Sequence, residues 1–167
     1  MTIGIFYGST TGTTEGVAER LGELLGVATD DLHNVAGCNP ERLADYDILV
    51  FGTSTWGLGD LQDDWEALLG KAGGVKLGGK KVAIFGLGDA GGYPDTFVDG
   101  MADLAAFAAE RGAEVMGAFP AACYGADASR SEEDGRYVGL ALDEDGHGEL
   151  TEDRLLAWSA LLKASFT

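Results

Sequence analysis

The sequence predicts an α/β domain, a three-layer doubly wound sandwich built on a five-stranded parallel sheet. Short apolar runs alternate along the chain with segments of helical periodicity, which is typical of strands joined by crossover helices. The runs are continuously apolar, as expected of strands that are covered by helices on both faces. A chain of 167 residues is long enough to bury one core, so we expect a single domain over residues 1–167.

The expected strands follow the apolar runs in chain order. "TIGIFYG" and "DILVFGT" indicate strong buried strands, and a weak strand is expected between them. The five predicted strands cover residues 2–8, 27–32, 47–53, 80–86 and 113–119. A long, polar, glycine-rich stretch over 120–139 breaks the alternation, and we expect an inserted loop or small excursion in the region of the last strand.

About five helices are expected from the same pattern, and four can be placed from apolar residues at helical spacing. They cover residues 14–25, 61–69, 94–112 and 151–166. Gly112 is predicted to end the third of these, because glycine often ends a helix. Thr151 is predicted to cap the last one.

The chain is strongly acidic, with 11 basic residues, 28 acidic residues and a net charge of −17. Such a surface repels nucleic acids and anionic membranes and favours encounter with basic protein surfaces. The alternative is that the acidity only aids solubility or reflects a salty cytoplasm. The sequence contains neither a long apolar window nor a cleavable leader, which predicts a cytoplasmic protein without a membrane span.

Three loops are expected to meet at the carboxyl ends of the strands, over residues 8–14, 53–60 and 86–95, where ligands bind in such folds. The first loop joins a strand to a helix, so backbone N–H groups and the positive end of the helix dipole converge there. Gly8 and Gly12 let the backbone curl around an anion. The hydroxyl donors of this loop are Ser9, Thr10, Thr11, Thr13 and Thr14.

The first loop contains no basic residue. A nucleotide-triphosphate loop reads GxxxxGK[ST], and its lysine and magnesium neutralise the β- and γ-phosphates. Here the spacing is GxxxG, and Thr13 stands where the lysine would be. A single phosphate monoester held by hydrogen bonds therefore fits better than a triphosphate. The alternative is a Ser/Thr-rich cap on an ordinary helix, which would use only one or two of these hydroxyls.

An aromatic residue occupies each of the other two loops. Trp56 lies in "TSTWGLGD" and Tyr93 in "GLGDAGGYPD", each just past a buried strand. Either residue alone is more often a cover over the core. Together, beside the first loop, they favour a site that sandwiches a planar ring.

These three loops, in this order, resemble those of the flavodoxin family. With the insertion, the sequence is similar to the long-chain class over essentially its whole length. The resemblance implies a flavodoxin-like fold, noncovalently bound FMN and single-electron transport. The matching motifs are "TTGTT" over 10–14, Thr55-Trp56, Gly88-Asp89 followed by Tyr93, and "YVGLALDEDG" over 137–146.

The resemblance also implies a role for each loop. The first would hold the FMN phosphate, the second would stack Trp56 on one isoalloxazine face, and the third would lay Tyr93 against the other. Gly88 and Asp89 would offer backbone groups to the pyrimidine end, and Asp145 would approach the ribityl chain. The expected cofactor-binding residues are Ser9, Thr10, Thr11, Gly12, Thr13, Thr14, Ser54, Thr55, Trp56, Gly57, Leu58, Gly59, Leu87, Gly88, Asp89, Tyr93, Asp95 and Asp145.

The implied function is a low-potential one-electron carrier that uses the quinone, neutral semiquinone and anionic hydroquinone states of FMN. A turn of the peptide at 57–58, which Gly57 permits, would let a backbone carbonyl accept a hydrogen bond from the protonated N5 of the semiquinone. The loops contain carboxylates but no lysine or arginine. The second reduction, which adds negative charge, is therefore expected at low potential.

The expected partners are basic-surfaced redox proteins, namely NAD(P)H- or ferredoxin-type reductases and acceptor enzymes. The protein itself is expected to be a monomer and not an enzyme. The alternative is an FMN-dependent NAD(P)H:quinone oxidoreductase on the same fold, which needs a substrate pocket over the ring. Trp56 and Tyr93 would cover both faces, which favours the carrier. A flavin-free interaction or response module is a third class.

Other patterns are weaker. "GLGDAG" over 86–91 has the GxGxxG spacing of a dinucleotide fold, but no helix is expected to begin inside it. "DEDGHGELTE" over 143–152 is similar to a calcium loop but would place Ala141 at the first ligand position. His33 and His147 have no paired acid at a suggestive spacing and are expected at the surface. No set of residues indicates a metal site or a catalytic nucleophile.

Overall fold

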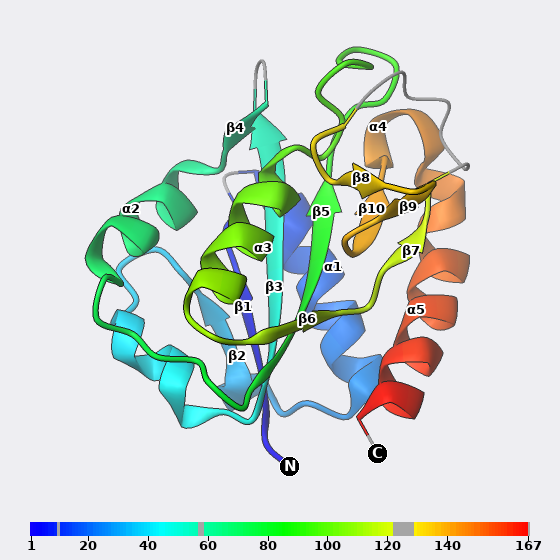
Figure 1. Cartoon of the computed structure of the whole chain (residues 1–167). Helices are drawn as coiled ribbons and strands as arrows, with labels where there is room; N and C mark the ends of the chain where they lie inside the picture. The colour runs from blue at the N-terminus through cyan, green and yellow to red at the C-terminus, as the bar shows by residue number, and fades with distance from the viewer. Residues whose placement is uncertain (10, 57–58, 122–128, 167) are drawn as a thin grey trace.

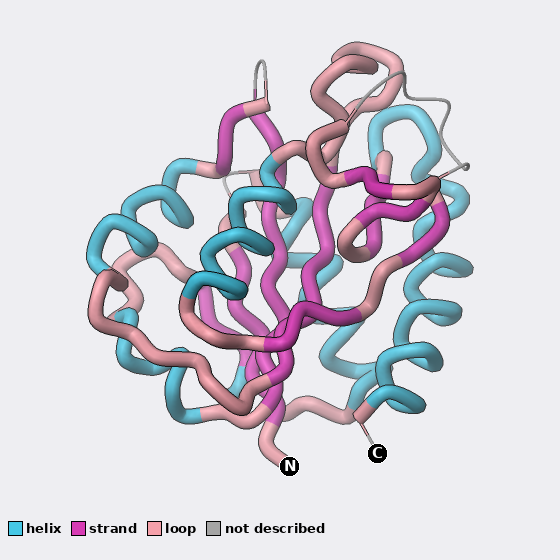
Figure 2. The backbone as a smooth tube through the Cα atoms, viewed as in Figure 1, coloured by secondary structure: helices cyan, strands magenta, loops and turns pink. Residues whose placement is uncertain are grey.

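The computed structural model describes residues 1–9, 11–56, 59–121 and 129–166. A parallel sheet runs through them in the order β10-β5-β3-β1-β2, with helices on both faces (Figures 1 and 2). This arrangement confirms the predicted doubly wound α/β fold. The strands of that order are β1 (Ile3–Tyr7), β2 (Leu32–Asn34), β3 (Ile48–Trp56), β5 (Lys81–Leu87) and β10 (Leu140–Leu142).

Helices α1 and α5 pack on one face of the sheet, and α2 and α3 pack on the other. Successive residues of β3 enter opposite clusters: Val50 packs with α1 and α5, and Phe51 with α2 and α3. The strands are continuously apolar because both faces are buried. No helix in the described part of the chain is long and apolar enough to cross a membrane. The helices are α1 (Thr13–Leu25), α2 (Asp63–Lys71), α3 (Gly100–Glu110), α4 (Glu144–His147) and α5 (Thr151–Ser165), with 3-10 turns at Thr29–Asp31, Pro40–Asp45 and Gly148–Leu150.

Two segments share the outer side of β5. β6 (Glu114–Met116) pairs with the first half of β5, and β10 pairs with its second half. The chain between them leaves the sheet, as the predicted insertion requires. The strand expected over 113–119 is therefore shortened to Glu114–Met116. The chain returns through Gly139, where a Cβ would lie 1.8 Å from the carbonyl oxygen of Ile84, so only glycine fits. The insertion forms a small antiparallel sheet of β7 (Phe119–Pro120), β9 (Arg136–Tyr137) and β8 (Glu132–Glu133).

Two predicted element starts are wrong. The weak strand expected over 27–32 begins only at Leu32, because the preceding residues form a 3-10 turn. The helix expected over 94–112 begins only at Gly100. Val98 has a φ of 48°, a left-handed conformation that interrupts a right-handed helix.

Of the two residues predicted to end or cap a helix, one is correct and one is wrong. Gly112, with a φ of 93°, follows the last turn of α3 as expected. Thr151 does not cap α5, because Leu150 occupies the N-cap position and the Thr151 hydroxyl donates to Glu144 instead.

The Tyr46 side chain packs against β1. Its ring packs so closely on Gly4 that a Cβ there would lie 2.5 Å from ring atom Cδ2. Its hydroxyl donates to Oδ1 of Asp31 at 2.9 Å and hydrogen-bonds with Nε2 of His33 at 2.6 Å. His33 is therefore half-buried and bonded, not a surface residue as expected. Burial and the bond to Asp31 raise the pKa of Tyr46 to about 12.

We expect Tyr46 to make the protein sensitive to alkali. An unfolded tyrosine ionises near pH 10, so Tyr46 stabilises the fold fully below that pH and loses its contribution as the pH rises to about 12. The loss amounts to about 2 kcal/mol. Urea unfolding of wild type and Tyr46→Phe between pH 9 and 12 measures it. The variant should be less stable at neutral pH, and its free energy of unfolding should depend less on pH in alkali. An equal pH dependence in the two proteins would contradict the assignment.

Candidate functional site

A cavity of about 290 Å³ lies at the carboxyl ends of the central strands. Its walls come from the loop after β1, the end of β3, the loop after β5 and the start of α4. The three predicted loops therefore meet at one site, as expected of the switch region of a doubly wound sheet. The described lining residues are Thr11, Thr13, Thr14, Ser54, Thr55, Leu87, Gly88, Asp89, Tyr93, Thr96, Phe97, Val98 and Glu144.

The first loop leads into the N-terminus of α1. Gly12 is the N-cap and has a φ of 89°, a conformation that favours glycine. The Ser9 hydroxyl accepts hydrogen bonds from the backbone N–H groups of Gly12 at 3.0 Å and Glu15 at 3.3 Å, which holds the turn. N–H groups in the first turn of a helix have no intrahelical partner. Those of Thr13 and Thr14 lie at the positive end of the helix dipole, beside the cavity that both residues line.

No lysine or arginine occurs among the described residues that line the cavity, where the charged residues are Asp89 and Glu144. Arg20 is the basic residue nearest to the first loop in the sequence, and its guanidinium contacts Glu152 at 2.5 Å and Glu23 at 2.9 Å. These hydrogen bonds raise the pKa of Arg20. An anion at the start of α1 would therefore be bound by hydrogen bonds and the helix dipole, without a charged side chain.

The second loop follows β3, which ends at Trp56 and pairs there with β4 (Asp60–Leu61). Ser54 lines the cavity, and its Oγ is buried with no hydrogen-bond partner in the described structure. The Oγ1 of Thr55, in contrast, accepts a hydrogen bond from the N–H of Gly100 at 2.9 Å and anchors α3. A buried hydroxyl without a partner costs free energy. Ser54 is therefore a candidate contact for a bound molecule.

Asp89 folds the third loop into a tight turn. Its carboxylate accepts the N–H groups of Gly91 at 3.1 Å and Gly92 at 2.8 Å. Its carbonyl accepts the N–H of Tyr93 at 2.8 Å. The turn leaves Tyr93 at the cavity with 47% of its surface exposed. This ring is available to pack against a flat ligand.

The buried carboxylate of Asp143 ties α4 to the third loop. Its Oδ1 accepts the N–H of Gly146 at 2.9 Å. Its Oδ2 accepts the N–H of Ala90 at 3.4 Å and hydrogen-bonds with Nδ1 of His147 at 3.0 Å. The prediction that His147 has no paired acid is wrong, since the two residues are one helical turn apart. The adjacent Glu144 lines the cavity.

The predicted site residues fall into three groups. Those that line the cavity are Thr11, Thr13, Thr14, Ser54, Thr55, Leu87, Gly88, Asp89 and Tyr93. Those that the structure describes away from the lining are Ser9, Gly12, Gly59 and the exposed Asp95. Those outside the described residues are Thr10, Gly57 and Leu58, together with the side chains of Trp56 and Asp145. Stacking on Trp56 and the peptide turn at 57–58 therefore stay predictions.

Four lining residues were missed by the sequence reasoning: Thr96, Phe97, Val98 and Glu144. The first three fell inside the helix expected over 94–112, so they were not recognised as loop. Glu144 lies next to Asp145, which the resemblance indicated instead. In addition, the N–H of Gly88 donates to the carbonyl of Leu142 at 3.0 Å, so this group is already used within the sheet.

The site has the chemistry of a binding pocket. In the described part of the chain, no group of three or more His, Cys, Asp or Glu side chains is placed to hold a metal ion. The cavity combines a helix N-terminus, three threonines of the first loop, a hydroxyl without a partner among the described residues, and an exposed aromatic ring. This combination suits a molecule with one phosphate group and a flat ring system.

Comparison with known proteins agrees with this chemistry. The flavodoxin family model matches residues 5–158. A flavodoxin of Picosynechococcus sp. is 42% identical over 165 residues, which cover 98% of this chain and 97% of that protein. Flavodoxin 1 of Salmonella typhimurium is 39% identical over 93% of this chain and 89% of its own length. The crystal structure of Fusobacterium nucleatum flavodoxin bound to flavin mononucleotide superposes with a TM-score of 0.91, at 29% identity and full coverage of both chains.

Substituting Ser54 tests whether its hydroxyl lacks a partner. Ser54→Ala should leave the free energy of unfolding of the ligand-free protein unchanged or raise it by about 1 kcal/mol, because no hydrogen bond is lost. Ser131→Ala is the matched control: that buried hydroxyl donates to the carbonyl of Val98 at 2.7 Å, and its loss should cost about 1–3 kcal/mol. Urea unfolding measures both. Equal destabilisation by the two substitutions would show that Ser54 has a partner.

Proposed function

The chain belongs to the flavodoxin family, and we propose that it is an electron-transfer protein that binds one FMN noncovalently in the cavity at the carboxyl edge of the sheet. The whole chain acts as one FMN-binding domain and has no substrate of its own to convert. The observation that carries the proposal is a helix N-terminus suited to an anion beside an exposed aromatic ring, in a cavity whose described lining residues include no lysine or arginine.

The described residues fit the phosphate end of FMN. The first-turn N–H groups of α1 and the hydroxyls of Thr11, Thr13 and Thr14 would bind the phosphate oxygens. Ser9 would act indirectly, since its hydroxyl is occupied by the N–H groups of Gly12 and Glu15 and so shapes the turn. The N-cap Gly12 would let the phosphate approach the backbone, because it has no side chain and no described atom beyond its chain neighbours lies within 4 Å of where its Cβ would be.

The described residues also fit the remainder of the cofactor. The exposed ring of Tyr93 would pack against the flavin, and the unpartnered hydroxyl of Ser54 would hydrogen-bond to one of its polar atoms. Trp56 would cover the opposite flavin face, and the peptide at 57–58 would hydrogen-bond to the ring edge. These last two roles rest on the resemblance of the motif.

When bound, FMN supplies a redox centre that takes up one electron at a time. The chain controls how easily negative charge is added to that centre. Asp89 and Glu144 line the cavity, no described lining residue is basic, and the net charge of the chain is −17. Each of these features disfavours the extra charge of the second reduction and lowers its potential.

The acidic surface also indicates the class of partner. Basic-surfaced reductases and acceptor enzymes would be steered to it electrostatically, so the rate of transfer should fall with ionic strength. A flavin enzyme that oxidises NAD(P)H itself would bleach rapidly when mixed with NADPH alone. The proposed monomeric carrier should need a separate reductase, and fast bleaching in stopped-flow mixing would contradict it.

The phosphate end is tested by Thr14→Val, which replaces the hydroxyl of this buried residue by a methyl group of similar size. Titration of ligand-free wild type with FMN should give one site and strong quenching of flavin fluorescence. The variant should bind FMN more weakly by roughly tenfold or more, as expected for one hydrogen bond to a charged group.

Riboflavin, which lacks the phosphate, is the control ligand for that substitution. Its affinity should be the same for wild type and Thr14→Val, since only the phosphate contact is removed. An equal loss of affinity for FMN and riboflavin would show that Thr14 does not contact the phosphate. A wild type that binds neither flavin would overturn the proposed function.

The charge argument is tested by Glu144→Gln, which removes a carboxylate from the cavity lining and keeps the side-chain shape. Potentiometric titration of the FMN-loaded protein should resolve two one-electron steps. The substitution should raise the second potential by on the order of tens of millivolts and the first by less. Glu149→Gln makes the same charge change at an exposed position outside the lining and should have a smaller effect. Equal shifts in the two variants would refute a local role for Glu144.

A further inference from the structure

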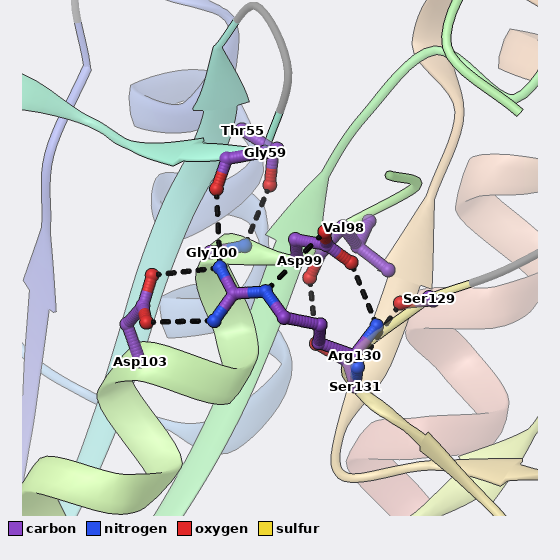
Figure 3. Close-up of polar contacts among 9 residues, drawn as sticks. All are labelled: Thr55, Gly59, Val98, Asp99, Gly100, Asp103, Ser129, Arg130 and Ser131. Carbon is purple, nitrogen blue, oxygen red and sulfur yellow. Dashed lines mark hydrogen bonds and ion pairs between the residues drawn. The ribbon is translucent and has the colours of Figure 1, made fainter. Parts of the chain in front are cut away.

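The insertion reaches back toward the site through Arg130, close to where the described chain resumes at Ser129. Its Nη1 and Nη2 bind the two carboxylate oxygens of Asp103 on α3, at 3.1 and 3.3 Å. Its Nη2 also donates to the carbonyl of Gly59 in the second loop at 3.2 Å. One guanidinium thus joins the insertion, α3 and the second loop (Figure 3).

Asp99 is the buried centre of this network. Only 4% of its surface is exposed. Its Oδ1 accepts the backbone N–H of Arg130 at 2.7 Å, and its Oδ2 lies 3.4 Å from Nε of the same residue. A buried carboxylate needs such partners, because water is not available to solvate it. Gly59 packs against it so closely that a Cβ there would lie 2.8 Å from Oδ2.

Val98, the neighbour of Asp99, lines the cavity in a strained conformation. It is fully buried and has a φ of 48°, which a β-branched residue adopts only when its surroundings force it. The Ser131 hydroxyl donates to its carbonyl at 2.7 Å. The insertion therefore holds the residue that bends the chain between the third loop and α3.

The same bend is bonded to the second loop. The N–H of Gly100 donates to Oγ1 of Thr55 at 2.9 Å, as Figure 3 shows. Arg130 and Ser131 thus contact one connected unit, which contains the end of the second loop, the strained turn before α3 and α3 itself. Within the described part of the chain, their hydrogen bonds do not reach the first loop, which leads into the N-terminus of α1.

We propose that Arg130 and Ser131 are positioning residues that brace the second and third loops in the conformation required by the flavin ring. The inference rests on the proposed FMN site and gives the insertion a role in it. Neither residue needs to touch the flavin: Arg130 acts through Gly59 and Asp99, and Ser131 acts through Val98. The brace supports the ring end of the site and leaves the phosphate end to α1.

Binding of two flavins by Arg130→Ala tests the brace. We expect the dissociation constants of FMN and of riboflavin to rise by a similar factor, tenfold or more, because the ring end is shared by both ligands. The visible circular dichroism of the bound flavin should change as well. Arg136→Ala is the matched control: it removes the same charge from the insertion, where Arg136 donates to the carbonyl of Ala118 at 3.0 Å. It should alter either affinity by less than twofold.

A purely structural role gives a different result. Urea unfolding of the ligand-free variants shows whether each is folded under the binding conditions. A folded Arg130→Ala protein that binds both flavins like wild type overturns the inference, as does weakening of FMN alone, which would indicate a long-range charge effect on the phosphate. If Arg130→Ala does not fold, Arg130→Lys keeps the charge but not the fork to Asp103 and Gly59. The Arg130→Lys substitution should raise the dissociation constants of both flavins at least threefold. Dissociation constants equal to those of wild type would overturn the inference.

Failure of the proposed function is distinguishable from failure of the brace. If the wild-type protein binds neither flavin, the proposed FMN site itself is wrong. If the wild type binds FMN but the Arg130 and Arg136 variants have the same flavin affinities, the proposed function stands and only the brace is wrong.

Discussion

In the proposed site, the FMN phosphate would have to be held without a positively charged side chain among the described lining residues, and that constraint would shape the rest of the site. The described lining contains threonine hydroxyls and the first-turn N–H groups of α1 but no lysine or arginine. Such groups bind an anion only when several of them converge on it. The glycine N-cap, the hydroxyl of Ser9 and the parallel sheet that aims α1 at the carboxyl edge provide that convergence.

The two ends of the site are built from different parts of the chain. The proposed phosphate end lies in β1, α1 and the turn between them, which are close in sequence. The proposed ring end includes polar contacts made by residues beyond position 120: Asp143 binds the N–H of Ala90, and Arg130 binds the carbonyl of Gly59. In the proposed function, the lack of a lysine or arginine among the described lining residues would affect both ends of the site. The phosphate would be left to neutral donors, and the potential of the second reduction would be lowered.

The sequence predicts what depends on local pattern. The buried strands, the hydroxyl-rich first loop and the meeting of three loops all follow from short motifs and the rules for parallel sheets. The late start of α3 does not, because the left-handed Val98 is held by Ser131 rather than by its own neighbours. The contact between Arg130 and Gly59 spans 71 residues and leaves no local signal. The shared pairing of β6 and β10 along β5 likewise depends on where the insertion returns.

The salt dependence of FMN binding tests the central claim most directly. FMN and riboflavin differ only in the phosphate, so the ratio of their dissociation constants isolates how that group is held. A phosphate bound by neutral donors in a chain of net charge −17 should bind equally well or better as added salt screens the repulsion. Calorimetry from low to physiological ionic strength should therefore give a constant or rising preference for FMN. A preference that falls steeply with salt would mean that a lysine or arginine holds the phosphate, and would contradict the account.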